Sequence, residues 1–161
     1  MASLVLDLEM EGASILPDKD LGSLGNVDSP SLMHYEPRDR RQVGRASIVA
    51  TYAGMEAQRR FDPSNDDGGD DDERQAFWIS SYYQVFPRYI SCVGDDRHCA
   101  YLERLRGEAR RLIRRHWSEV EMVAGLLLVH KRLDRDRLKG LSRDHLRTPK
   151  EEEADNVKRN A

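Results

Sequence analysis

The sequence predicts an α+β fold that is mainly α, with a small N-terminal β element followed by a helix bundle. Short apolar runs lie before residue 31, and one of them stops at Pro17, as strands do at a proline. From Pro37 onward, apolar and small residues recur every three or four positions, which is the spacing of one helical face. The 161 residues are enough for one domain with its own core.

Composition excludes several classes of protein. Charged residues make up 34% of the chain and the formal net charge is −3, so charge alone predicts no nucleic-acid partner. Two cysteines form no disulfide framework, which predicts a reduced, cytoplasmic protein. The longest apolar run, Val123–Val129, is far shorter than the roughly 20 residues that span a bilayer, so no membrane segment is expected in this chain.

The β element is predicted over residues 3–31. Its first strand is expected at Ser3–Leu8, because leucine occupies every second position there. A second short strand is expected at Ala13–Leu16. The following stretch, 18–31, is rich in Gly, Asp, Ser, Asn and Pro, which indicates a loop or hairpin connection.

The helical part is predicted over residues 37–143. Its first helix should begin at Pro37 and end at Arg59 and Arg60, where cations suit the negative end of the helix dipole. One face of this helix carries small or short side chains: Ala46, Val49, Ala50, Ala53 and Ala57. Small faces allow close approach of another element, so tight packing is the simplest explanation of this pattern.

The next helix is expected to follow an acidic loop. Three carboxylates at 70–72 should cap its first amides, and the helix should continue over Gln75–Tyr89 with a stop or kink at Pro87. A loop is then expected at Ser91–His98.

The last helices carry the clearest apolar periodicity in the chain. Two helices are expected at Tyr101–Arg115 and Glu119–Lys131, and they should meet at His116. Asp134 can cap a final short helix that ends at Leu141. The domain is therefore predicted to cover residues 1–143, and the polar residues 144–161 are predicted to form a disordered tail.

The acidic loop contains a candidate calcium site. Oxygen-bearing or loop residues occupy positions 1, 3, 5, 7, 9 and 12 of a possible calcium loop: Asp62, Ser64, Asp66, Gly68, Asp70 and Glu73. Position 6, however, holds Asp67 in place of the glycine that the sharp turn needs. The alternative is a solvated acidic loop that caps the following helix.

Other candidate residues have ordinary explanations. His116 lies on the apolar side of its helix, as a hydrogen-bonded core histidine would. The spacing of Cys92, His98 and Cys99 fits no zinc finger. The arginines between 104 and 115 fit a solvated helix face paired with nearby acids. No nucleotide-binding loop and no His-Glu-x-x-His motif is present in this sequence.

Several motifs occur in an order that points to one family. They are a strand ending in proline (Ala13–Pro17) with Leu24-Gly25, a helix containing Gly-x-x-Ala (Ile48–Ala57), a Gly-x-x-x-Asp-x-x-x-Ala segment (Gly68–Ala76), a final helix pair (Glu108–Leu128) and a closing Leu-Asp segment (Leu133–Leu138). In this order they resemble the peptidase domain of FtsH-type ATP-dependent zinc metalloproteases, in the part that follows the zinc helix. The resemblance covers roughly residues 4 to 141.

The resemblance implies zinc as cofactor, a protein or peptide substrate, and an oligomeric assembly. It places the family's third zinc ligand on Asp72, with Asp70 and Asp71 as alternatives because the acidic run is degenerate. Glu73 follows where the family usually has leucine. The family's His-Glu-x-x-His helix would lie before residue 4, so we assign no catalytic residue and expect no proteolysis from this chain alone.

A third interpretation, besides a peptidase-like domain and a calcium-binding protein, is a non-enzymatic helical interaction module. If a preceding helix is absent, the small face formed by Ala46, Ala50 and Ala53 could leave an apolar groove for a partner.

Overall fold

The computed structural model describes residues 1–17, 26–28, 30–64, 69–83, 85 and 95–145. Along the chain the elements are α1 (Ala2–Val5), β1 (Gly12–Ser14), β2 (Asn26–Asp28), the 3-10 turn η1 (Leu32–His34), α2 (Pro37–Phe61), α3 (Gly69–Tyr82), α4 (Asp96–Arg115), α5 (Trp117–His130), β3 (Arg132–Asp134) and α6 (Arg135–His145). The predicted class, a mainly helical α+β fold with a small sheet near the start and helices after it, is confirmed.

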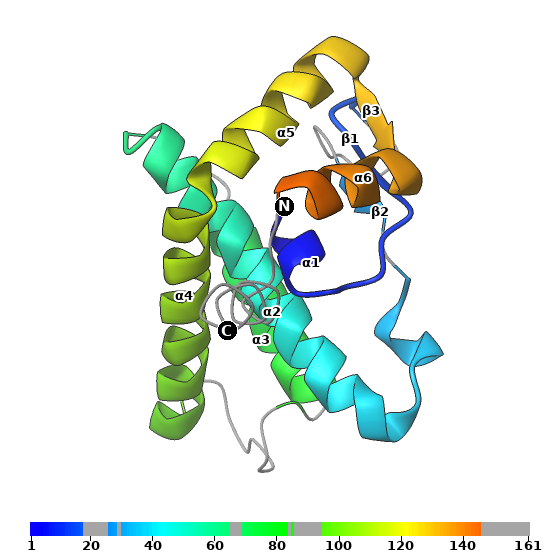
Figure 1. Cartoon of the computed structure of the whole chain (residues 1–161). Helices are drawn as coiled ribbons and strands as arrows, with labels where there is room; N and C mark the ends of the chain where they lie inside the picture. The colour runs from blue at the N-terminus through cyan, green and yellow to red at the C-terminus, as the bar shows by residue number, and fades with distance from the viewer. Residues whose placement is uncertain (18–25, 29, 65–68, 84, 86–94, 146–161) are drawn as a thin grey trace, which may run out of the picture.

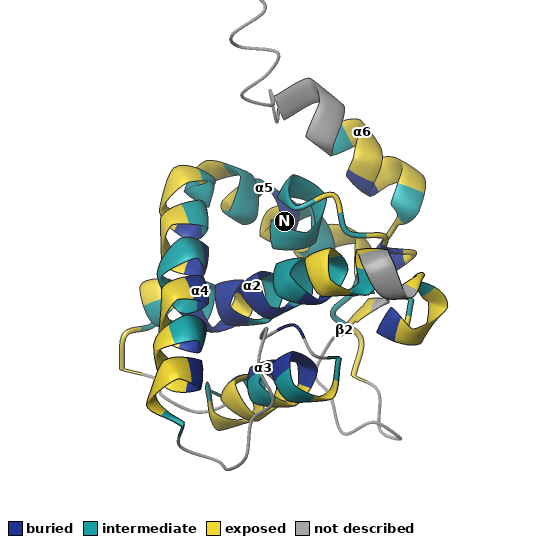
Figure 2. Ribbon diagram, turned by 90° about the horizontal axis from the view of Figure 1, so that it is seen from below, coloured by how far each residue is buried: buried dark blue, intermediate teal, exposed yellow. Residues whose placement is uncertain are grey.

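Helix α2 is the element around which the others pack. It contacts both α3 and α4, and also α1 and η1 (Figure 1). Its buried side chains fall on one broad face and include Ile48, Val49, Tyr52, Ala53 and Met55. Burial of this face, at roughly 25 cal/mol per Å² of apolar surface, is the main force that holds the bundle together. Figure 2 shows the buried residues of α2, α3 and α4 on the sides of these helices that turn toward one another.

The apolar residues of helix α4 are buried at the spacing that the sequence pattern predicts. Leu102, Leu105, Ala109 and Ile113 are all buried, and their spacing of three or four residues places them on one face against α2. The chain breaks helical geometry at His116 and continues as α5, which confirms the predicted junction. Helix α5 ends at Lys131, whose left-handed conformation (φ 64°) turns the chain into β3.

The sheet joins the two ends of the described chain. Its strand order is β2-β1-β3, and both pairings are antiparallel, with Ala13 opposite Val27 on one side and Leu133 on the other. Gly12 suits this sheet because a side-chain carbon there would lie 2.8 Å from the Leu133 carbonyl oxygen. A second apolar cluster (Met10, Ala13, Val123, Leu133 and Leu138) packs the sheet against α5 and α6.

The strand predicted at Ser3–Leu8 is wrong, because α1 occupies Ala2–Val5 and the first strand begins only at Gly12. The turn of helix sends Ala2 and Leu6 toward the α2 core and Leu4 toward the second cluster. A short apolar run cannot be assigned to helix or strand by its period alone. Here packing against two separate apolar clusters stabilises the helix. Strand β3 was also missed, since Arg132–Asp134 pairs with a segment that lies far away in sequence.

The boundaries of other elements differ from the prediction. The strand expected at Ala13–Leu16 occupies Gly12–Ser14, and the connection expected at 18–31 contains β2. Helix α3 ends at Tyr82, before the predicted end, and α4 begins at Asp96 inside the predicted loop. Asp95 causes the earlier start, because its carboxylate accepts hydrogen bonds from the amides of Arg97 and His98.

The C-terminal helix starts as expected. Asp134 Oδ1 accepts a hydrogen bond from the Arg137 amide at 2.9 Å, and α6 extends past Leu141 to His145. The stop at Pro87 and the tail beyond residue 145 lie outside the described residues. None of the described helices combines the length and the apolar character that crossing a bilayer requires.

Candidate functional site

The three carboxylates at the start of α3 have different environments. Asp70 and Asp71 are exposed, and Asp71 pairs with Arg74 one turn along the helix. Asp72 is half-buried and faces α2, where a side-chain carbon at Gly54 would lie 4.0 Å from its Oδ2. Burial, with a smaller contribution from the charge of Asp71, raises the pKa of the Asp72 carboxyl. The ionised form of Asp72 would therefore gain from a nearby cation.

The described residues alone do not complete a zinc site around Asp72. Zinc in proteins takes three or four nitrogen, sulfur or carboxylate ligands. Within the described ranges, no three His, Cys, Asp or Glu side chains are grouped so that they could hold a metal ion. The described residues therefore supply Asp72 as a single candidate ligand for zinc.

The predicted calcium loop is only partly described. Asp62 Oδ1 accepts hydrogen bonds from the amide and hydroxyl of Ser64, at 3.1 and 2.6 Å, which closes a local turn. Glu73, the predicted last ligand, lies on α3 and accepts a hydrogen bond from Arg106 Nη1 at 3.2 Å. Calcium would have to compete with this guanidinium. Asp66 and Gly68 lie outside the described residues.

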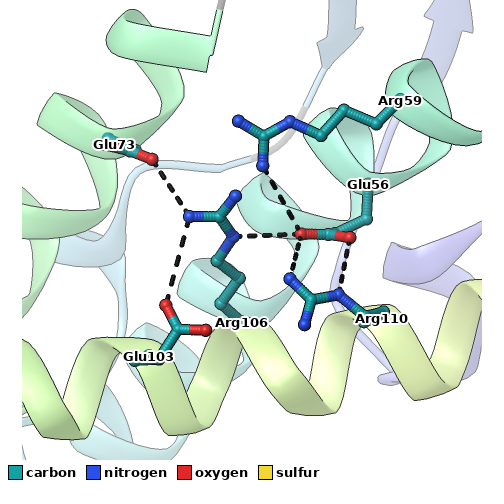
Figure 3. Close-up of polar contacts among 6 residues, drawn as sticks. All are labelled: Glu56, Arg59, Glu73, Glu103, Arg106 and Arg110. Carbon is teal, nitrogen blue, oxygen red and sulfur yellow. Dashed lines mark hydrogen bonds and ion pairs between the residues drawn. The ribbon is translucent and has the colours of Figure 1, made fainter. Parts of the chain in front are cut away.

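A buried carboxylate connects α2 to α4. Glu56 is 8% exposed, and two arginines of α4 converge on it (Figure 3). Arg106 Nε donates to Glu56 Oε1 at 3.0 Å, while Arg110 donates to both oxygens at 3.0 and 3.1 Å. Arg59 Nη1 lies 3.8 Å from the same carboxylate. The two-pronged contact of Arg110 adds geometric specificity to the charge pairing.

This ionic cluster extends to α3 through Arg106. Its Nη1 lies 3.2 Å from Glu73 and 4.0 Å from Glu103 (Figure 3). Three carboxylates (Glu56, Glu73 and Glu103) therefore surround three guanidiniums (Arg59, Arg106 and Arg110), and the charges of the six side chains balance.

Sequence analysis missed Glu56 and misplaced Arg106. The prediction of a solvated arginine face is wrong for Arg106, whose side chain is 19% exposed and turned inward. A signal was present, because Glu56 falls three residues after Ala53 and four after Tyr52, on the buried face of α2. An acid at such a position requires a cationic partner, since a buried unpaired charge is costly.

A buried serine–histidine pair lies between α3 and α4. Ser80 and His98 are both 0% exposed, and Ser80 Oγ lies 2.5 Å from His98 Nε2. Ser80 also donates its hydroxyl proton to the Phe77 carbonyl oxygen at 2.9 Å, so on this assignment Nε2 of His98 is the donor of the pair. Full burial keeps substrate away from the serine, and we assign the pair a structural role.

Burial of His98 predicts a loss of stability in mild acid. Desolvation lowers the pKa of His98, and the nearby Asp95 opposes this only in part. The unfolded chain therefore takes up a proton near pH 6.5 while the folded chain does not, and stability falls as the pH drops below that value, by up to about 1.4 kcal/mol per pH unit. Urea denaturation at pH 7.5, 6.5 and 5.5 measures this slope.

Two histidine variants distinguish the contribution of His98 to the pH dependence of stability from the contributions of other titrating groups. His98→Gln should flatten the pH profile, because the amide cannot take up the proton. His130→Gln is the matched control, because it changes an exposed histidine and leaves the pair between α3 and α4 intact. Equal slopes in wild type and His98→Gln would contradict the assignment.

Of the three alanines predicted to leave an apolar groove, only Ala50 lines the groove that the structure has beside α2. A groove of about 360 Å³ is bounded by α2, α3 and the N-terminal segment, and Ala50, Val43, Trp78 and Tyr83 contribute to it. Ala50 lies in this groove, whereas Ala53 is 1% exposed and belongs to the core. The prediction that Ala53 lines a groove is therefore wrong.

Among the described residues, the other candidates, His116, His98 and Cys99, form no group that could hold a metal ion. His116 is half-buried and its Nδ1 lies 3.5 Å from Glu119 Oε1, as expected for a hydrogen-bonded histidine at the edge of a core. Cys99 is an exposed free thiol, while its neighbour His98 is buried. Cys92 lies outside the described residues.

Comparison of this chain with protein-family models finds no match, and comparison with curated proteins finds none either.

Proposed function

We propose that this chain is the part of an FtsH-type zinc metallopeptidase domain that follows the zinc helix, with Asp72 as the carboxylate ligand. One observation carries the proposal. Gly54 and Asp72 belong to two separate motifs of the resemblance, Gly-x-x-Ala and Gly-x-x-x-Asp-x-x-x-Ala. In the fold they lie opposite each other, between α2 and α3.

The chemistry of Asp72 supports this choice over Asp70 and Asp71. A metal ligand must be held in place, and Asp72 is half-buried at the first turn of α3, while its two neighbours are exposed. The pKa of Asp72 is raised by burial, so its carboxylate is poorly solvated and would be stabilised by a cation. Gly54 leaves room in front of it. Because the described residues supply one ligand, we assign them no hydrolytic step.

The proposal predicts that Asp72 is the acidic residue required for zinc binding. We would clone the gene with the reading frame extended upstream of Met1 and read that frame for His-Glu-x-x-His about one helix before Leu4. The extended protein should hold about one zinc per chain by atomic absorption and cleave casein. Asp72→Asn should reduce both by at least tenfold, because it removes a charged ligand.

Asp71→Asn is the matched control, since it changes an exposed neighbour in the same turn and should leave zinc content within about twofold. Zinc retained by the Asp72→Asn protein would contradict the ligand assignment. Stop codons directly upstream would contradict the peptidase proposal. The interaction module, with the groove beside Trp78 as its surface, would then be the better hypothesis.

A further inference from the structure

A hollow lined by arginines lies where α2 ends, beside the last turns of α4. It measures about 390 Å³ and is lined by Glu56, Arg59, Arg60, Arg110, Ile113 and Arg114, and we call it the arginine hollow. Four arginines and one glutamate thus contribute to the lining of one hollow. Volumes of 300–1,000 Å³ are typical of sites for small ligands.

Two of these arginines, Arg60 and Arg114, have no carboxylate partner among the described residues. Arg59 and Arg110 belong to the balanced ionic cluster around Glu56. The Arg60 guanidinium lies 4.4 Å from the centre of the Trp117 ring, a contact that orients the side chain without cancelling its charge. Arg114 is exposed, and the described part of the chain shows no carboxylate paired with it or with Arg60.

Helix dipoles reduce this excess without removing it. Arg60 and Arg114 both lie in the last turns of their helices, α2 and α4. Each helix end contributes a partial negative charge of about half a unit. Two guanidiniums against two half-charges leave an excess of about one positive charge near the hollow.

The side chains that line the hollow indicate the chemical class of its ligand. Guanidinium groups bind phosphate oxygens through paired N–H donors, and two of those on the walls are held in place, Arg60 by Trp117 and Arg110 by Glu56. Arg60 comes from α2 and Arg114 from α4, so the hollow offers arginines from two helices, and a ligand with two linked phosphates has one phosphate group for each. We propose that the arginine hollow binds a small diphosphate-bearing anion, either free pyrophosphate or the diphosphate of a nucleotide.

Calorimetric titration of the whole chain tests this proposal. Pyrophosphate and ADP should each bind at one saturable site in 50 mM salt, and more weakly in 300 mM salt because exposed charges are screened. Arg114→Gln and Arg60→Gln should each weaken pyrophosphate binding at least tenfold. Circular dichroism and melting confirm that the variants fold. Equal affinity for the two ligands identifies the diphosphate as the whole recognised group, whereas tighter ADP binding adds a contact to the nucleoside.

Arg111→Gln is the matched control. Arg111 is an exposed arginine on the same helix that does not line the hollow, so its loss should change affinity by less than twofold. An equal loss in Arg111→Gln and Arg114→Gln would show diffuse attraction to the arginine-rich helix and overturn the proposal. So would the absence of saturable binding up to millimolar pyrophosphate.

Discussion

Replacing Glu56 with glutamine is expected to destabilise the protein by about 2–4 kcal/mol, somewhat less than the roughly 3–5 kcal/mol for breaking a fully buried ion pair, because solvent reaches part of the cluster. Glutamine keeps the size of the side chain but removes the charge that Arg106 and Arg110 share. The guanidiniums then repel each other, and Arg106, which is 19% exposed, loses its closest acid. Urea denaturation of wild type and variant gives the difference in the free energy of unfolding.

Glu103→Gln is the control for this experiment. Glu103 contacts the same arginine, Arg106, but at 4.0 Å and with its side chain 64% exposed. Its loss should cost less than about 0.5 kcal/mol, as for other exposed ion pairs. The penalty of Glu56→Gln should also shrink in high salt, which screens repulsion between the arginines. Similar losses of stability in the two variants would show that burial of the Glu56 ion pairs does not contribute to the stability of the protein.

Replacing Leu105 with alanine is expected to cost about 2–5 kcal/mol, the range for truncating a buried leucine. Leu105 is 0% exposed and belongs to the cluster in which α4 packs against α2. Helix propensity does not explain such a loss, because alanine is the better helix former. The cost comes from lost apolar burial and from the cavity left between two rigid helices. Thermal and urea denaturation both measure it.

The control is the same substitution at an exposed leucine. Leu128 on α5 is 66% exposed, so Leu128→Ala should change stability by less than about 0.5 kcal/mol. If the two variants had the same midpoint in urea, the assignment of the core to the α2–α4 contact would be wrong.

Helical elements were predictable wherever the apolar pattern was long. Helix α2 and the break at His116 follow from a period of three to four residues sustained over many turns. Asp134 as a cap was also predictable, because capping depends on the carboxylate and on amides two or three residues away. Short elements were not predictable. Ser3–Leu8 has room for only one turn, and the two cores decide its conformation.

The sequence by itself determined the mainly helical class, the long helices and the acidic start of α3, because these depend on contacts between residues that are close along the chain. Only the tertiary structure decided that β3 joins β1, that Asp72 faces Gly54, and that Arg106 and Arg110 converge on Glu56. These pairs are separated by many residues, and no local pattern encodes them. Their partners are selected when the helices pack and each buried polar group must find an opposite charge or a hydrogen bond.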